Sequence, residues 1–167
     1  MFKVTGILLV TLAAAASAAS ACSCAEAPSP SAALQVADVV VGGVVLGVGS
    51  IIGAPMPDSL RARGIVSSSD LLGWRIAVTE VWKGEAGDTM VIYSARYGSS
   101  CGIEFRVGQK YLIYGSHRRT KDLRNYFTIT IPDSVITTTG RCTRTREFES
   151  AGEDLQQLPG PVWTSEK

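Results

Sequence analysis

The sequence has little histidine and no excess of charge of either sign. His117 is the only histidine, and there is no H-E-x-x-H motif, the helical pattern with which many metalloproteases bind their zinc. Apart from Lys3 near the N-terminus, 15 basic residues stand against 15 acidic ones. Such a neutral chain lacks the basic surface of a nucleic-acid-binding protein or of an electrostatic membrane anchor. We therefore expect no nucleic-acid partner, no enzyme activity and no cofactor.

Beyond residue 21 the sequence also lacks the roughly 18 uninterrupted apolar residues of a transmembrane helix. The apolar stretch 7–16 follows Lys3 and precedes Ala19-Ser20-Ala21, a pattern of small residues that signal peptidases cleave. We predict that residues 1–21 are a signal peptide and that an exported chain begins at Cys22, in the extracellular space, the periplasm or the cell envelope. The alternative is a lipoprotein signal, in which lipid on Cys22 would attach the protein to a membrane.

Cysteine is scarce, with only Cys22, Cys24, Cys101 and Cys142 present. In an exported chain four cysteines are typical of two disulfides. A bridge between Cys22 and Cys24 would be strained, so these two should pair with Cys101 and Cys142, in one of two ways. Each bridge would close a loop of roughly 80 to 120 residues and stabilise the fold by about 4 kcal/mol. A zinc site is the alternative, although no C-x-x-C pair accompanies the single histidine.

The 146 residues after the predicted cleavage site are enough for one domain. Runs of valine, isoleucine and threonine between glycine-rich turns indicate a mainly β fold. A closed or partly closed barrel would leave few exposed strand edges, and a sandwich is the alternative. We predict strands at 39–48, 74–82, 89–94, 110–115 and 126–131, a shorter strand at 135–139, helices at 31–36 and 147–158, and a long exposed loop at 49–70.

The aromatic residues and the histidine have structural interpretations. Trp74, Trp82, Tyr111 and Tyr114 could in principle form a stacking platform for single-stranded nucleic acid, as in some small barrels. Because the chain is neutral, we expect them instead in the core and at the barrel rim. We interpret His117, which is followed by two arginines, as an ordinary loop residue.

Five short motifs together resemble a known family. They are Cys22-Ser23-Cys24, Ala37-Asp38-Val39-Val40, Val81-Trp82-Lys83-Gly84, Ser100-Cys101-Gly102 and Lys110-Tyr111-Leu112-Ile113. In this order and spacing they resemble the N-terminal domain of the tissue inhibitors of metalloproteinases. The resemblance covers about residues 22–145. It implies a five-stranded OB-type closed barrel, the netrin-like module, over residues 22–146, followed by a short C-terminal helix and tail in residues 147–167. It also implies the disulfides Cys22–Cys101 and Cys24–Cys142.

The function that the resemblance implies is inhibition of a zinc metalloprotease by a monomer. The α-amino group and carbonyl oxygen of Cys22 would chelate the partner's catalytic zinc, and Ser23 would enter the pocket for the substrate side chain. The contact ridge would comprise Cys24, Ala25, Ser99 and Ser100. The sequence departs from the animal members of the family in two respects, since it has neither a cysteine near 34–36 for a third bridge nor a cysteine-rich C-terminal subdomain. It therefore resembles the short, single-domain members. An exported module that binds another protein without inhibiting it is the alternative.

Overall fold

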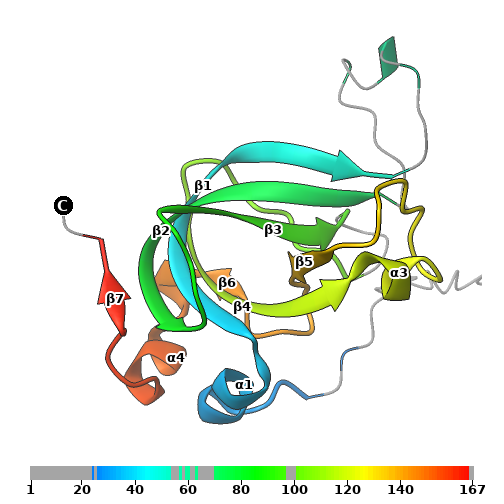
Figure 1. Cartoon of the computed structure of the whole chain (residues 1–167). Helices are drawn as coiled ribbons and strands as arrows, with labels where there is room; N and C mark the ends of the chain where they lie inside the picture. Colours follow the sequence, from blue (N-terminus) through cyan, green and yellow to red (C-terminus); the bar gives the residue numbers. More distant parts are fainter. Residues whose placement is uncertain are drawn as a thin grey trace, which may run out of the picture.

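The computed structural model describes Cys24 and residues 26–53, 70–96 and 101–165, together with Pro57, Ser59, Leu60 and Arg63. In these ranges the chain is mainly β (Figure 1). Every helix described there is too short or too polar to span a bilayer. The main strands are β1 (Val39–Ile52), β2 (Leu71–Lys83), β3 (Thr89–Ala95), β4 (Lys110–Arg119) and β5 (Val135–Thr138). The remaining elements are α1 (Pro30–Val36), α3 (Thr120–Leu123), β6 (Arg146–Glu147), the 3₁₀ helix η1 (Phe148–Ser150), α4 (Gly152–Gln157) and β7 (Trp163–Thr164).

The five main strands form a ring of hydrogen-bonded pairs. β1 pairs with both β2 and β4, β2 pairs with β3, and β5 joins β3 to β4. All of these pairs are antiparallel except β3–β5, which is parallel and involves only Ile92 with Thr137 and Tyr93 with Thr138. Because that contact is so short, the ring is not a regular barrel. The two-residue strands β6 and β7 extend it beside β4 and β2.

β1 is central because its side chains are buried on both faces. Val39, Val41 and Val45 point into the ring, where they pack with Trp74, Ile76 and Ile113. Val40 points outward and is covered by the layer of α1 and α4. Gly43 permits close strand pairing, because a Cβ there would lie 2.7 Å from the Ala77 carbonyl oxygen. A strand buried on both faces explains the continuous valine run in the sequence.

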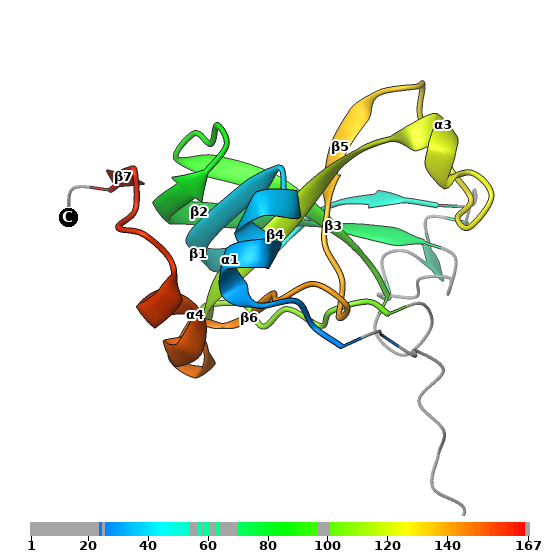
Figure 2. The same cartoon turned by 90° about the horizontal axis from the view of Figure 1, so that it is seen from below.

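The helices cover opposite ends of the ring (Figure 1). α1 and α4 lie side by side at one end, and α3 follows β4 at the other (Figure 2). Ser29 caps α1, since its hydroxyl accepts a hydrogen bond from the Ala32 amide at 3.3 Å, and Pro30 occupies the first turn. At the C-terminal end of α1, Lys83 Nζ donates to the carbonyl oxygens of Leu34 and Gln35 at 2.9 and 2.7 Å. β2 thus fixes the helix that follows the N-terminal segment.

Several predicted elements are confirmed and others are wrong. The helix at 31–36, four of the five long strands and the short strand near 135 are present, and the predicted core aromatics Trp74, Trp82, Tyr111 and Tyr114 are buried. The predicted strand at 126–131 is wrong, because this segment is irregular. Residues 49–52 belong to β1 instead of a loop, and His117 lies on β4. The predicted helix 147–158 is divided at Ala151 into η1 and α4.

Candidate functional site

Most of the predicted binding ridge falls outside the described residues. Of its six members the structure describes only Cys24, which is exposed. Five lie outside the described ranges: Cys22, Ser23, Ala25, Ser99 and Ser100. The predicted signal peptide, residues 1–21, also lies outside them. The described part of the candidate site therefore consists of Cys24 and the residues that hold it in place.

One of the two disulfides implied by the family resemblance is confirmed. Cys24 is bridged to Cys142, with a Cα–Cα distance of 5.2 Å across a sequence separation of 118. Cys101 is also disulfide-bonded. Its predicted partner, Cys22, lies outside the described residues, so the bridge Cys22–Cys101 remains a prediction.

The three described cysteines meet at one point of the surface. The Sγ atoms of Cys24, Cys101 and Cys142 all lie within 4.8 Å of one another. Cys24 and Cys142 are exposed and Cys101 is half-buried. Bridged sulfurs do not offer the thiolate that a structural zinc site uses, which argues against the zinc alternative for this cluster. The arrangement fixes the start of the described chain against the segments that contain residues 101 and 142.

The backbone around Cys101 is tightly constrained. Cys101 has a φ of 55°, in the left-handed region that non-glycine residues seldom adopt. The next residue, Gly102, packs so closely that a Cβ there would overlap the Ala95 carbonyl oxygen at the end of β3. The Ile103 amide donates to Ser94 Oγ at 2.9 Å, and the Arg141 amide donates to the Cys101 carbonyl at 2.7 Å. The Arg141–Cys101 hydrogen bond joins the two cysteine-bearing segments through their main chains, and the other two contacts hold the Cys101 segment against β3.

Threonine hydroxyls hold the turn that contains Cys142. Thr139 Oγ1 donates to the Tyr114 carbonyl oxygen on β4 at 2.9 Å. Thr143 Oγ1 lies 2.8 Å from the Gly140 carbonyl oxygen and 2.9 Å from Thr145 Oγ1. Thr145 Oγ1 in turn accepts from the Tyr114 amide at 2.9 Å. The turn is thereby anchored to the centre of the sheet.

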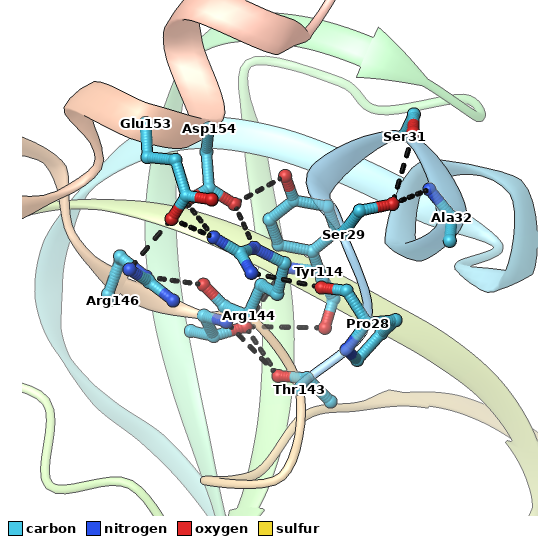
Figure 3. A network of polar contacts seen from close by, with 11 residues as sticks. Pro28, Ser29, Ser31, Ala32, Tyr114, Thr143, Arg144, Arg146, Glu153 and Asp154 are labelled. Carbon is cyan, nitrogen blue, oxygen red and sulfur yellow. Dashed lines mark hydrogen bonds and ion pairs between the residues drawn. The ribbon is translucent and has the colours of Figure 1, made fainter. Parts of the chain in front are cut away.

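A buried ion pair next to this turn holds the N-terminal segment (Figure 3). Arg144 Nε donates to Asp154 Oδ1 at 2.7 Å, and neither side chain is appreciably exposed. The Tyr114 hydroxyl donates to the same oxygen at 2.9 Å. Arg144 Nη1 donates to the Pro28 carbonyl oxygen at 2.9 Å. The ion pair therefore connects α4 and β4 to the chain just after Cys24.

The ionisation of this group follows from its contacts. Burial alone would raise the pKa of Asp154, but the hydrogen bonds from Arg144 and Tyr114 outweigh it and hold the pKa below its usual value. Burial, together with the hydrogen bond to Asp154, raises the pKa of the Tyr114 hydroxyl. Asp154 is thus a carboxylate and Tyr114 a neutral donor throughout the physiological range.

Besides a small pocket of about 100 Å³ between Cys142 and α1, two larger pockets lie near the cysteine cluster. A polar one of about 330 Å³ adjoins Gly102 and is lined by Glu104, Arg106, Arg141 and Glu147 among others. A smaller one of about 180 Å³ includes Cys101 and Cys142 in its wall and is largely apolar. One polar pocket and one largely apolar pocket therefore lie beside the point where the three cysteines meet.

Residues 98–102 read G-x-S-x-G, with Ser100 at the centre, which is the pattern of a hydrolase nucleophile elbow. Such an elbow requires a strand, a sharp turn and then a helix. Here β3 ends at Ala95, and residues 101–109 form no helix. The described histidine, His117, is exposed, and its Nδ1 lies 3.2 Å from Thr137 Oγ1. The described surroundings therefore lack the helix of a nucleophile elbow, and absence of enzyme activity remains a prediction.

The grouping of Arg144, Asp154 and Tyr114 was not predicted from the sequence. A signal was present in the sequence, because Asp154 interrupts the apolar positions Phe148, Ala151, Leu155 and Leu158 of the predicted terminal helix. An acid on the apolar face of a helix needs a buried cationic or donor partner. The sequence does not specify which arginine provides it.

Comparison with known proteins gives no further assignment: no family model matches the chain, and no curated protein matches it.

Proposed function

We propose that this chain is an exported inhibitor of a zinc metalloprotease, of the short type within the family of tissue inhibitors of metalloproteinases. Cleavage after Ala21 would expose the α-amino group of Cys22. That amine and the Cys22 carbonyl oxygen would bind the partner's catalytic zinc at the position normally held by water. The observation that carries the proposal is the cluster of Cys24, Cys101 and Cys142, with sulfurs within 4.8 Å of one another and Cys24 exposed.

The strand order supports the fold that the proposal requires. The ring β1–β2–β3–β5–β4, with β4 returning to β1 and a parallel β3–β5 contact, is compatible with a five-stranded, partly open barrel of OB type. In this interpretation the N-terminal residues that precede α1 cross one end of the barrel. The confirmed Cys24–Cys142 bridge is the one that the family resemblance implies.

The contacts behind Cys24 support a preorganised binding edge. Arg144 holds the Pro28 carbonyl oxygen, Ser29 caps α1, and the Cys24–Cys142 bridge fixes the chain four residues earlier. A segment that is already ordered loses little conformational entropy when it enters a partner's cleft. In the proposed complex Ser23 would enter the partner's side-chain pocket, and Cys24, Ala25, Ser99 and Ser100 would contact the rim.

The chemistry of chelation is available near neutral pH. An α-amino group has a reference pKa of about 7.7 to 8.0, so the neutral form that donates a lone pair to zinc is accessible at little cost. The sulfur of Cys22 would take no part, because the proposal places it in a bridge to Cys101.

The test compares the native mature chain with one that carries an extra alanine before Cys22. The extension leaves every cysteine in place but moves the amine away from the zinc, so inhibition of a panel of zinc proteases should be lost. Acetylation of the native amine should have the same effect, because an amide nitrogen has no available lone pair. Peptide mapping should find Cys22–Cys101 and Cys24–Cys142 in both forms. Equal inhibition by the native and extended chains would contradict chelation.

The same experiment addresses the alternative of a non-inhibitory protein-binding module, which the two pockets beside the cysteine cluster favour. A partner bound through those pockets should be retained by the extended chain. The mass of the mature protein separates a free Cys22 amine from the lipidated cysteine of a lipoprotein.

A further inference from the structure

The smaller pocket beside the cysteine cluster has the character of a ligand site. It measures about 180 Å³ and lies where β3, the end of β4, α3 and the turn at 139–143 meet. Its apolar wall comes from Leu71, Ala95, Leu123 and Phe127, with Tyr93 beside them. Several of these residues belong to a distinct hydrophobic cluster at this end of the molecule, separate from the interior of the ring.

The volume limits what the pocket can hold. An apolar cavity of about 150 Å³ is known to accept benzene, whereas pockets for drug-sized molecules run to about 300 Å³ and more. At about 180 Å³ this pocket fits one six-membered ring or one branched aliphatic group with a small substituent. A nucleotide or a sugar chain would extend well outside it.

The polar groups that line the pocket indicate which polar substituent its ligand should carry. Among the described lining residues Arg118 is the single charged one. The Arg118 side chain makes no hydrogen bond or ion pair in the described structure, whereas its neighbour Arg119 is paired with Asp133. Arg118 lies opposite the buried Ile136 in the β4–β5 ladder, so both side chains are on the same face of the sheet. The guanidinium is thus available to an anion at the pocket mouth.

The threonine hydroxyl groups of the pocket already donate within the protein, and the Tyr93 hydroxyl accepts a hydrogen bond from Ser50 Oγ at 3.0 Å. Thr138 Oγ1 donates to the Ser116 carbonyl oxygen, Thr139 Oγ1 to that of Tyr114, and Thr143 Oγ1 to that of Gly140. The charged donor among the described lining residues is the planar fork of Arg118, whose geometry matches a carboxylate through two parallel hydrogen bonds. The single positive charge of Arg118 would balance the single negative charge of one carboxylate.

We propose that this pocket binds a carboxylate that carries one ring or one branched aliphatic group. The apolar group lies among Leu123, Phe127 and Ala95, and the carboxylate pairs with Arg118. Two sources share this chemistry: a free small carboxylic acid, and the C-terminal residue of a polypeptide with an apolar side chain. The site does not involve Cys22, so the test of this proposal is independent of the test of protease inhibition.

The test is a titration of the isotope-labelled mature protein, followed by amide chemical shifts. The probes are phenylacetate, 2-phenylethanol as the uncharged analogue with the same ring, and acetate as the anion without a ring. We expect saturable shifts at residues 123–127 and 138–143, with phenylacetate binding about tenfold more tightly than either analogue because it alone makes both contacts. No shift at millimolar phenylacetate, or shifts away from these residues, would overturn the proposal.

Variants at the pocket mouth isolate the role of charge. Arg118→Gln should reduce phenylacetate affinity to that of 2-phenylethanol, and Arg118→Lys should retain part of it, since the charge remains without the fork. Arg118 is exposed, so both variants should fold. The matched control is Arg124→Gln, an exposed arginine that follows α3 and does not line the pocket. Unchanged phenylacetate affinity in Arg118→Gln overturns the proposal.

A second pair of probes separates the two sources. A tetrapeptide with a C-terminal phenylalanine is compared with its C-terminal amide. Tighter binding of the free-acid peptide than of phenylacetate assigns the pocket to a polypeptide terminus, and binding of phenylacetate alone assigns it to a small acid. Equal affinity of the acid and amide peptides at the same residues contradicts recognition of a carboxylate.

Discussion

Asp154 is the most deeply buried of the described carboxylates, with a relative exposure of 0%. Its side chain is fully buried and receives hydrogen bonds from Arg144 and Tyr114, and Arg146 Nη1 lies 3.7 Å away. Removing one member of such a buried pair leaves an uncompensated charge. We expect Asp154→Asn to lower the free energy of unfolding by about 3 to 5 kcal/mol, measured by urea denaturation.

The neighbouring residue provides the control. Glu153 pairs with the same arginine at 2.8 Å, but its side chain is 60% exposed. An exposed ion pair contributes about 0 to 1 kcal/mol, so Glu153→Gln should be nearly neutral. Similar losses in the two variants would show that burial does not determine the strength of these contacts.

The same carboxylate gives the protein a pH dependence with a defined sign. The contacts of Asp154 hold its pKa below the value of about 3.9 expected in the unfolded chain. The contribution of the ion pair is therefore complete above about pH 4 and is lost as the pH falls through the lower pKa of the folded state. The difference in urea midpoint between the wild type and Asp154→Asn should shrink as the pH falls below about 4. A constant difference over that range would be inconsistent with titration of Asp154.

At the scale of elements, local sequence patterns identified most strands but not all of their limits. The valine run of β1 and the alternation of β2 are strong signals, and both strands are present. β1 nevertheless continues beyond the predicted end at Val48 to Ile52 through Gly49, a residue type of low strand propensity, because Leu71–Trp74 pairs with it there. Pairing with a neighbouring strand outweighs local propensity in this case.

The segment 126–131 was predicted to be a strand but forms none. Its apolar residues Phe127, Ile129 and Ile131 alternate as in a strand, and they do pack against a hydrophobic cluster. The segment forms no strand because β5 already occupies the edge of β4 at Ser116–Arg119. Periodicity predicted which side chains would be buried, whereas the availability of a strand edge depends on the whole fold.

The connection between β3 and β4 depends on one glycine. A side chain at Gly102 would overlap the backbone of Ala95, so a segment with little freedom would have to move. We expect Gly102→Ala to destabilise the fold by about 1 to 3 kcal/mol in thermal or urea unfolding. Gly152→Ala is the matched control, because a Cβ at Gly152 in the first turn of α4 meets nothing within 4 Å. Equal stability of the two variants would contradict the close packing at Gly102.

At the scale of the whole molecule, the candidate site was only partly predictable. The need for long-range bridges followed from the cysteine spacing, but the choice of Cys142 as the partner of Cys24 came from the family resemblance, since spacing leaves two pairings equally acceptable. The support behind that bridge, a threonine-rich turn and a buried arginine, depends on contacts between β4, α4 and the N-terminal segment. Such contacts leave no periodic signal in the sequence.

The Cys24–Cys142 bridge should contribute strongly to global stability. It closes a loop with a sequence separation of 118, for which the chain-entropy estimate is about 4 to 5 kcal/mol. The double variant Cys24→Ser with Cys142→Ser should lose about that much in urea unfolding. Its m value should rise, because the denatured chain exposes more surface without the cross-link. A loss below about 1 kcal/mol would mean that strain offsets the bridge.

The position of Cys142 late in the chain also affects the order in which the protein can be assembled during synthesis. Cys101 leaves the ribosome about 2 to 8 s before Cys142, at a typical rate of about 5 to 20 residues per second. For that interval Cys24 can meet Cys101, whose sulfur lies within 4.8 Å of it in the finished fold, but not its own partner. Oxidation during this interval would trap a wrong pair that only thiol–disulfide exchange could correct. The nascent chain therefore gains its native pairing most directly if Cys24 stays reduced until nearly the whole domain has emerged.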